Sequence, residues 1–400
     1  MSDLLVKNAR PWGGPAADVL IRDGVIADAG STRPGTPVLD GGNRLLLPSF
    51  SDVHVHLDST RLGLPFRPHT GAPGVWPMVM NDRENWRHDQ ESAAERATST
   101  LGMMIERGVT RVRSYAQIDV DCGLERFHAV QAAAAEHRDR CEVQIIAFPQ
   151  AGLLREAGTV PLIRQALQEG AAWVGGIDPC TLDRDPKGHL DVLFALAEEF
   201  QVPVDVHLHE PGHLGVFSTD LILERVRALG MQGLLSMSHS YDLGSVGEAT
   251  TRRLVEEFAE LDVSMATVAP AQQRGLPLVD LVRSGVRVGL GEDGQRDFWS
   301  PYGNADMLDR TWQLAFTHQF RADELIEHCV AIATVGGASI MSRDIARLSS
   351  VSDRPGLAVG DSGDLVLVPG DTVTSAVMDR PEDRLVIHAG RVVADGLQLA

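Results

Sequence analysis

The pattern of apolar and polar positions divides the chain into a long middle part and two short ends. In the middle, from about residue 49 to 349, short apolar runs rich in β-branched residues alternate with segments that have the spacing of amphipathic helices. The runs that predict strands are 51–56, 109–114, 142–147, 173–177, 204–207, 234–238, 262–266 and 287–290. Helices are predicted between them, for example over 94–107, 124–137, 161–169, 190–200 and 221–229. This alternation is typical of a parallel β/α architecture.

The number of these units favours one particular α/β fold. Eight strand-and-helix units over about 300 residues match the size of a (β/α)8 barrel of the TIM type. A doubly wound open sheet has the same local pattern and is the alternative. No glycine-rich dinucleotide or phosphate motif follows the first strand, so the nucleotide-binding form of that alternative gains no support. We therefore predict a barrel over residues 49–349.

The two ends of the chain share a different pattern. Short strands separated by turn signals are predicted at 4–8, 18–21 and 25–29, and again at 364–368 and 385–393. Because both ends are rich in β structure and the middle is not, we expect residues 1–48 and 350–400 to pair into one small β domain.

Composition and charge limit the classes of function. The chain carries 36 Lys and Arg against 55 Asp and Glu, a net charge of −19, and 44% of its residues are apolar. This apolar content argues against disorder, and the negative charge argues against nucleic acid or an anionic membrane as a partner. No apolar run approaches the roughly 20 residues that cross a bilayer, and no signal-peptide pattern opens the sequence. The four cysteines lack metal-type spacing, so a cytoplasmic protein with reduced cysteines is expected.

Polar residues of one chemical kind follow four of the predicted strands. His54 and His56 end the first strand, His207 the fifth and His239 the sixth, and Asp293 follows the eighth. The carboxyl ends of barrel strands meet on one face, which is where active sites of this fold lie. Two histidines two positions apart on a strand point the same way, so both imidazoles can bind one ion. This joint placement indicates a metal or acid–base site.

Longer motifs resemble the amidohydrolase superfamily, which consists of metal-dependent hydrolases on a (β/α)8 barrel with a small β-sandwich built from both chain ends. Segments that resemble its cytosine deaminase branch are 48–58 (PSFSDVHVHLD), 147–150 (AFPQ), 205–210 (DVHLHE), 238–239 (SH) and 298–307 (FWSPYGNADM). Segments similar to the N-isopropylammelide amidohydrolases of triazine degradation are 174–179 (VGGIDP), 215–218 (GVFS) and 296–299 (RDFW). The resemblance covers essentially the whole chain.

The resemblance implies that His54, His56, His207 and Asp293 are metal ligands. Three neutral imidazoles and one carboxylate suit Zn²⁺ or Fe²⁺ and leave room for a water molecule. The sequence therefore predicts a divalent metal ion as the cofactor.

Lysine content bears on the number of metal ions. Two-metal members of the superfamily generally bridge their ions with a carboxylated lysine, or a carboxylate, at the end of the fourth barrel strand. The chain has two lysines, Lys7 in the β domain and Lys187 about ten residues beyond the fourth strand. We therefore predict one ion per chain.

By the same resemblance, the reaction is the hydrolytic removal of an amino group from an N-heterocycle. The ion would lower the pKa of a water molecule, Asp293 would accept its proton, and His239 would stabilise the charge on the tetrahedral centre. Glu210 would carry a proton to the ring and the leaving amine. Gln150 would hydrogen-bond the ring, and Trp299 would line the pocket.

Two positions depart from the cytosine deaminase pattern. Those enzymes commonly have a second aspartate directly after the metal aspartate, where this chain has Gly294, and the change is expected to enlarge the pocket and remove a polar contact. His209 stands where that branch has an acidic residue and is similar to the triazine branch. We expect the loop over 61–86 to shape the pocket. The expected substrate is an amino-substituted pyrimidine, triazine or similar ring.

Several functions therefore stay open. The first is a deaminase that releases ammonia from cytosine or a substituted pyrimidine, and the second is an N-alkylammelide-type amidohydrolase that releases an alkylamine. A cyclic-amide hydrolase is disfavoured by the lack of a lysine at the fourth strand. A binding protein without turnover is disfavoured because it would need neither Glu210 nor His239. The resemblance also implies a homo-oligomer.

Overall fold

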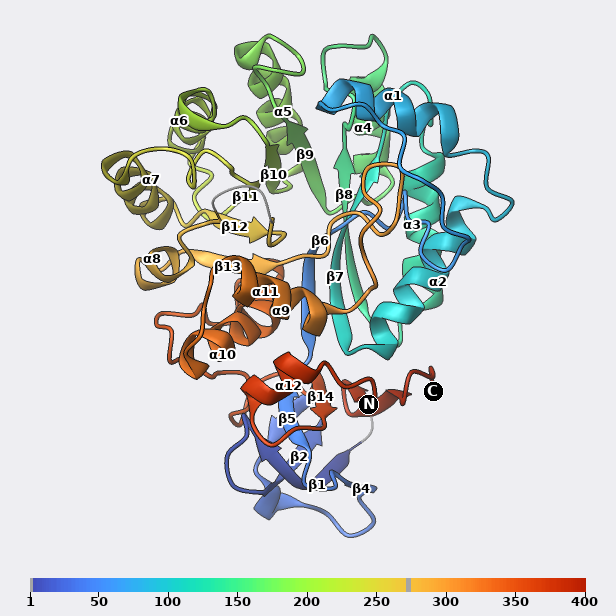
Figure 1. Ribbon diagram of the computed structural model, residues 1–400, viewed down its shortest axis with the longest axis vertical. Helices are drawn as coiled ribbons and strands as arrows, with labels where there is room; N and C mark the ends of the chain where they lie inside the picture. The colour runs from blue at the N-terminus through green and yellow to red at the C-terminus, as the bar shows by residue number, and fades with distance from the viewer. Residues whose placement is uncertain (1–2, 271–274) are drawn as a thin grey trace.

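Eight parallel strands form a barrel in the computed structural model, which describes residues 3–270 and 275–400 (Figure 1). Each strand pairs with its successor in the chain. The strands are β6 (Phe50–Val55), β7 (Val109–Gln117), β8 (Glu142–Phe148), β9 (Trp173–Ile177), β10 (Val204–Leu208), β11 (Leu235–His239), β12 (Ser264–Thr267) and β13 (Arg287–Leu290). The strand predictions agree with these bounds to within a few residues because buried parallel strands are continuous apolar runs.

The barrel closes between its last and first strands. Just beyond β13, Asp293 forms a parallel bridge with Val55, and its backbone N–H donates to the carbonyl oxygen of His54 at 2.7 Å. Gly291 permits this approach, because a Cβ atom there would lie 2.4 Å from the Cβ of His54. The closure confirms the barrel over the open sheet, and it takes place at the residues predicted to bind metal.

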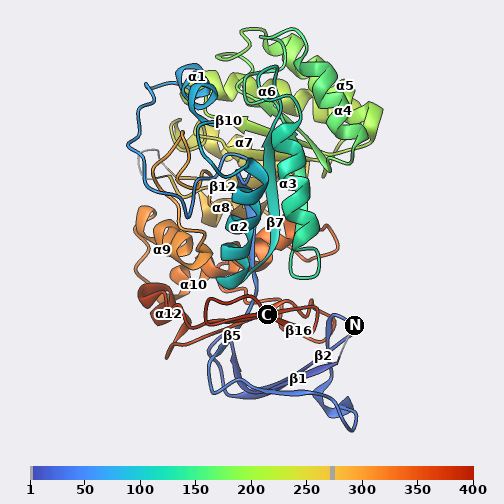
Figure 2. The same ribbon diagram turned by 90° about the vertical axis from the view of Figure 1, so that its right-hand side faces the viewer.

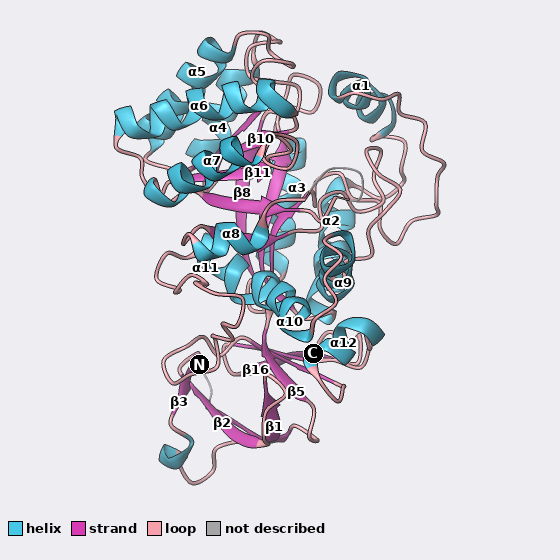
Figure 3. Cartoon of the chain, turned by 60° about the vertical axis from the view of Figure 1, so that its left-hand side comes forward, coloured by secondary structure: helices cyan, strands magenta, loops and turns pink. Residues whose placement is uncertain are grey.

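Helices surround the strands on the outside of the barrel (Figure 3). They are α1 (Val75–Asn85), α2 (Ala93–Glu106), α3 (Glu125–Glu136), α4 (Thr159–Gln168), α5 (Pro186–Phe200), α6 (Gly212–Leu229), α7 (Glu248–Glu260), α8 (Leu278–Arg283), α9 (Met307–Thr317), α10 (Asp323–Ala331) and α11 (Gly337–Met341). Helix α2 begins with a capping box, in which Ser92 and Glu95 bond each other's backbone N–H groups. Helix α1 lies within the segment expected to be a loop.

One helical segment corrects the sequence analysis. Helices α10 and α11, joined by the π-helical turn Ile332–Gly336, form a continuous stretch over Asp323–Met341 that is long and apolar enough to cross a membrane, with a mean hydropathy of 1.3. The expectation that no segment approaches this length is therefore wrong. The stretch is 83% buried inside the protein, where it packs against β6 and β13. Its apolar character is accounted for by packing beneath the barrel.

Both ends of the chain form a second sheet, which lies below the barrel (Figure 2). The strand order in this sheet is β16-β15-β14-β5-β1-β2-β3, and β4 pairs with β1. The strands are β1 (Leu4–Pro11), β2 (Ala17–Arg22), β3 (Val25–Ala27), β4 (Val38–Asp40), β5 (Leu45–Pro48), β14 (Leu365–Val368), β15 (Leu385–His388) and β16 (Arg391–Asp395), and α12 (Val373–Asp379) follows β14. The antiparallel pair β5 and β14 joins the two ends. The predicted fold, a barrel with a β-sandwich domain from both termini, is confirmed.

Buried ion pairs connect the two domains. Asp364, next to β14, lies 2.5 Å from Arg111 of β7 and 2.9 Å from Nδ1 of His388. Arg384 is fully buried and makes a bidentate contact with Asp306 at 2.7 and 2.9 Å. Paired and hydrogen-bonded charges of this kind fix the orientation of packed elements, because an unpaired buried charge is costly.

Candidate metal centre and active site

The predicted ligands come together at the carboxyl end of the barrel. Ligand nitrogens of His54, His56 and His207 lie within 4.8 Å of one another, as do ligand atoms of His54, His239 and Asp293. Oδ1 of Asp293 is 3.6 Å from Nε2 of both His54 and His56. The carboxyl ends of β6, β10, β11 and β13 therefore supply one compact cluster.

The chemistry of this cluster fits a divalent metal ion. Both ring nitrogens of His54 and of His207 are buried and have no hydrogen-bond partner among the described residues, although buried polar atoms normally have one. Burial lowers the pKa of His54 and His207, so the neutral ligand form is favoured. Burial would raise the pKa of Asp293, but His54, His239 and His56 outweigh it and hold this pKa well below its usual value. Neutral imidazoles around an ionised carboxylate are a typical donor set for such an ion.

A buried polar layer beneath the cluster orients the ligands. The carboxylate of Asp205 on β10 accepts hydrogen bonds from Arg113 at 3.0 Å, from Tyr115 at 3.0 Å and from Ser238 at 3.2 Å. Its Oδ1 also lies 3.5 Å from Nδ1 of His207. Contacts of this type fix the orientation of a ligand ring and raise its basicity.

Backbone strain gathers where these strands end. The φ angles of His239, Asp293 and Asp178 are 67°, 63° and 35°, in the left-handed region that residues other than glycine rarely adopt. Such a residue costs about 1–3 kcal/mol, and strained positions cluster at functional sites. The three residues lie at or just beyond the ends of β11, β13 and β9.

A cavity of about 350 Å³ opens above the cluster. It is lined by His56, Gly74, Val75, Met78, Gln150, His207, His209, His239, Tyr241, Asp293, Gly294, Asp297, Trp299 and Ser300. Val75, Met78 and Trp299 form an apolar wall. Gln150 and Trp299, the residues predicted to bind substrate, therefore both lie at the cavity, and α1 supplies part of the wall.

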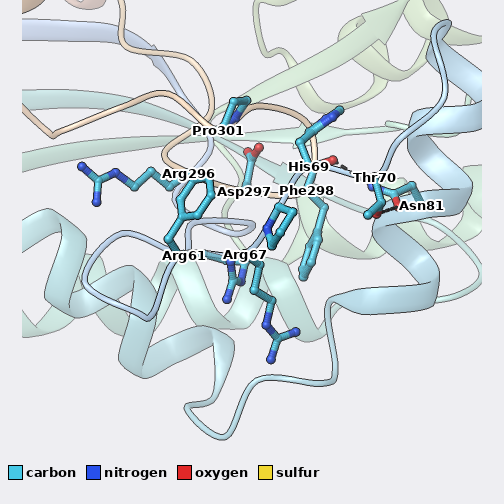
Figure 4. A pocket seen from close by; sticks show the side chains of 11 residues that line it. Arg61, Arg67, His69, Thr70, Asn81, Arg296, Asp297, Phe298 and Pro301 are labelled. Carbon is cyan, nitrogen blue, oxygen red and sulfur yellow. Dashed lines mark hydrogen bonds between the residues drawn. The ribbon is translucent and has the colours of Figure 1, made fainter.

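The roof of the cavity joins α1 to the loop after β13. Asn81 donates to the carbonyl oxygen of Phe298 at 3.0 Å, and Nε2 of His69 lies 3.1 Å from the carbonyl oxygen of Trp299. Figure 4 shows a smaller neighbouring cavity, where His69 and Asn81 lie beside Asp297 and Phe298. These contacts hold the segment that carries Asp297 and Trp299 in place.

Glu210 lies outside the lining of the cavity. Its Oε1 accepts the backbone N–H groups of Cys180 at 2.9 Å and Thr181 at 2.6 Å, and its Oε2 accepts the hydroxyl of Ser218 at 2.5 Å. Burial raises the pKa of Glu210. The carboxylate therefore connects the loop after β9 to α6. The proton-carrying role assigned to Glu210 by the sequence analysis stays a prediction.

His209, which the sequence left undecided, lines the cavity. Its Nδ1 is 2.8 Å from Asp178 Oδ2, its backbone N–H donates to Asp178 Oδ1 at 2.7 Å, and its ring lies 4.3 Å from that of His239. Burial would lower the pKa of His209, but Asp178 outweighs this effect and raises it. Asp178 was not among the residues predicted from the sequence, although its place directly after the fourth barrel strand was a usable signal.

Gly294 lines the cavity next to the carboxylate of Asp297. A Cβ atom at this position would lie 2.6 Å from Oδ2 of Asp297, so the carboxylate of Asp297 already fills that volume. Asp297 therefore brings a carboxylate to this position, and the expected enlargement of the pocket stays a prediction. Asp297 and Tyr241 are further lining residues that the sequence analysis did not identify.

Comparison with known proteins places this site in a family. The profile described as Amidohydrolase family matches residues 76–394, most of the chain. The chain belongs to the amidohydrolase family. This amidohydrolase is 35% identical to the N-isopropylammelide isopropylaminohydrolase of Burkholderia multivorans, whose structure superposes with a TM-score of 0.92 over 100% of both chains.

Two further relatives represent both branches that the motifs indicated. The 5-methylcytosine deaminase of Klebsiella pneumoniae is 25% identical in sequence, and its structure superposes with a TM-score of 0.77 over 98% of each chain. The N-isopropylammelide isopropyl amidohydrolase of Pseudomonas sp. strain ADP is 26% identical over 362 residues, 89% of this amidohydrolase and 87% of the relative. The predicted superfamily is confirmed, and the protein is a hydrolase.

Proposed function

We propose that this amidohydrolase removes an amino or alkylamino group from an N-heterocyclic ring by hydrolysis. The observation that carries the proposal is a cavity lined by Gln150, above imidazoles that have no hydrogen-bond partner among the described residues and beside the carboxylate of Asp293. Relatives named for N-isopropylammelide hydrolysis and 5-methylcytosine deamination support the class of ring.

One divalent ion, Zn²⁺ or Fe²⁺, held by His54, His56, His207 and Asp293, would supply an activated water molecule. Two observations support a single ion. Lys187 lies on the outer helix α5, 79% exposed and paired with Asp191. Asp178, the carboxylate at the end of the fourth barrel strand, is bound to His209 instead.

The residues of the cavity have separate tasks in the reaction. Asp293, ionised because of the surrounding imidazoles, accepts a proton at its carboxylate. His239, whose pKa burial holds well below its usual value, is neutral and orients the attacking water through its ring. His209, held by Asp178, carries a proton at Nε2 to the ring nitrogen and the leaving amine. Gln150 presents a side-chain amide that can both donate to and accept from the ring edge.

A second candidate, release of an alkylamine, is favoured by the apolar wall. Val75, Met78 and Trp299 belong to the lining of the same cavity as the polar groups and offer an alkyl substituent an apolar surface. Cytosine itself has no apolar substituent that would pack against these three residues. We therefore include N-alkylated aminotriazines and bulkier pyrimidines among the proposed substrates.

The test is a release screen on metal-loaded protein. Ammonia and alkylamine are measured with aminopyrimidines, aminotriazines, their N-alkyl derivatives and pterins, and bound metal is counted by elemental analysis. The expected result is turnover of at least one ring by protein with one ion per chain. Protein that carries its ion and releases no amine from any compound would refute the proposal.

Two variants decide which residue carries the proton. His209→Asn should lower kcat by roughly 10²-fold or more with metal content unchanged, because general acid catalysis contributes about that much. Glu210→Gln is the matched comparison, since the amide oxygen can still accept the N–H groups of Cys180 and Thr181. If Glu210→Gln instead abolishes turnover and His209→Asn does not, the task belongs to Glu210.

A further inference from the structure

Asp297 brings to the cavity a carboxylate that the reaction described above does not use. Its Oδ1 accepts the backbone N–H groups of Trp299 and Ser300, both at 2.8 Å. Its Oδ2 accepts the hydroxyl of Ser59 at 2.9 Å and no other hydrogen bond from the described part of the chain. A carboxylate oxygen can accept two hydrogen bonds, so Oδ1 is saturated and Oδ2 has one position left.

The free position on Oδ2 lies beside the reacting end of the cavity. A Cβ atom on Gly294 would lie 2.6 Å from Oδ2, so this oxygen rests over the residue that directly follows Asp293. Both Gly294 and Asp297 belong to the lining of the cavity. A ring whose reacting carbon lay at the metal cluster would therefore present its edge to this acceptor.

The acceptor is fixed before a substrate arrives. Asp297 is 7% exposed and its carboxylate receives three hydrogen bonds from its surroundings. The loop that carries it is held at Phe298 by Asn81 and at Trp299 by His69. A preorganised acceptor discriminates strongly, because a substrate without a matching donor leaves it desolvated and unpaired.

We propose that Asp297 determines specificity by accepting a hydrogen bond from a ring N–H of the substrate. This inference rests on the proposed function and narrows it to oxo-substituted amino heterocycles in their lactam form, whose ring carries an N–H group. Rings with a bare or alkylated nitrogen at that position are rejected. Gln150 and Asp297 then contact different groups of the same ring, and Asp297 touches the substrate without taking part in bond breaking.

The decisive variant is Asp297→Asn. Its amide oxygen can keep the N–H groups of Trp299 and Ser300, and its NH₂ group can donate to the hydroxyl of Ser59, so the loop stays in place while the group facing the cavity changes from acceptor to donor. For the ring found in the screen, kcat/KM should fall roughly 100-fold, mainly through KM. On the analogue whose ring N–H is replaced by N–CH₃, the activity of Asp297→Asn should differ little from that of the wild type. Bound metal should stay the same.

Two other variants separate recognition from loop structure. Tyr302→Phe, the control in the same loop, changes an exposed side chain outside the lining of the cavity and should retain kcat/KM within about threefold. Gly294→Ala keeps Asp297 but pushes its carboxylate aside, so it should weaken recognition of the N–H ring as Asp297→Asn does. A structural role alone would lower activity on both members of the N–H and N–CH₃ pair equally.

The outcomes distinguish this inference from the proposed function. If the wild type hydrolyses rings and Asp297→Asn prefers N–H over N–CH₃ rings as strongly as the wild type does, the role of Asp297 is overturned and the function stands. If the metal-loaded wild type releases no amine at all, the proposed function is refuted. The role of Asp297 is then tested by measuring ligand binding with calorimetry. Wild type should then bind uracil or cyanuric acid more tightly than their N-methyl derivatives, and Asp297→Asn should lose that preference. Equal preference in both proteins refutes the inference.

Discussion

The buried pair of Arg113 and Asp205 beneath the metal cluster gives the most quantitative prediction. Both side chains are fully buried, and Nη2 of Arg113 lies 3.0 Å from Oδ2 of Asp205. Asp205→Ala leaves the guanidinium with two neutral acceptors, the carbonyl oxygen of Val53 and the hydroxyl of Ser236. Removing one partner of a buried ion pair costs about 3–5 kcal/mol, because the remaining charge has neither water nor a counter-charge.

The other partners of Asp205 add little to this cost. Tyr115 and Ser238 also lose an acceptor, but their hydroxyl groups are 2.8 Å apart and can pair with each other. We therefore expect Asp205→Ala to lower the free energy of unfolding by about 3–5 kcal/mol. Because Asp205 Oδ1 lies 3.5 Å from Nδ1 of His207, metal affinity should also fall roughly 10- to 100-fold.

The assay is denaturant unfolding of metal-free protein, so that weaker metal binding does not contribute to the difference. Circular dichroism and tryptophan fluorescence are recorded together, and the free energy is taken where both transitions coincide. The double variant Arg113→Met with Asp205→Leu should recover at least half of the loss, since an apolar pair replaces the ions. A loss below about 1 kcal/mol in Asp205→Ala, the size of one ordinary hydrogen bond, would refute the reasoning. So would a double variant that loses the sum of both single changes.

Further predictions concern metal, pH and the apolar wall. Chelation should lower the melting temperature, since an ion present at 1,000 times its Kd stabilises the fold by about 4 kcal/mol; calorimetry that shows no shift would contradict a bound ion. Burial would raise the pKa of Asp364, but His388 and Arg111 outweigh it and lower this pKa to about 2 from an ordinary 3.8. The stabilising contribution of Asp364 is therefore present above pH 3.8 and lost as the pH falls through about 2. Asp364→Asn should cost about 2 kcal/mol at pH 7, and the difference in stability between wild type and variant should shrink as the pH falls below 3.8 and vanish below about 2. Met78→Ala should lower kcat/KM for N-alkyl substrates roughly tenfold more than for unsubstituted rings, and an equal loss on both would argue against the alkyl-binding role of the wall.

The sequence determined those features that depend on local order along the chain. Strand positions followed from apolar runs, and the spacing of His54 and His56 was visible because both lie on one strand. The helix α1 was missed because only Met78, Val79 and Asp82 are buried along it, which leaves no clear amphipathic pattern. Asp82 is buried through its 2.6 Å contact with Arg126, a residue of α3 that is distant in sequence.

Only the tertiary structure decided which side chains share the cavity. The pairing of His209 with Asp178 depends on β9 and β10 lying side by side, and the carboxylate of Asp297 beside Gly294 is held by Ser59, which is distant in sequence. Glu210 points away for the same kind of reason, since its partners come from the loop after β9 and from α6. Local periodicity records which face of a strand a residue occupies. It does not record which residues from other strands and loops meet there, because those contacts are fixed only when the barrel closes.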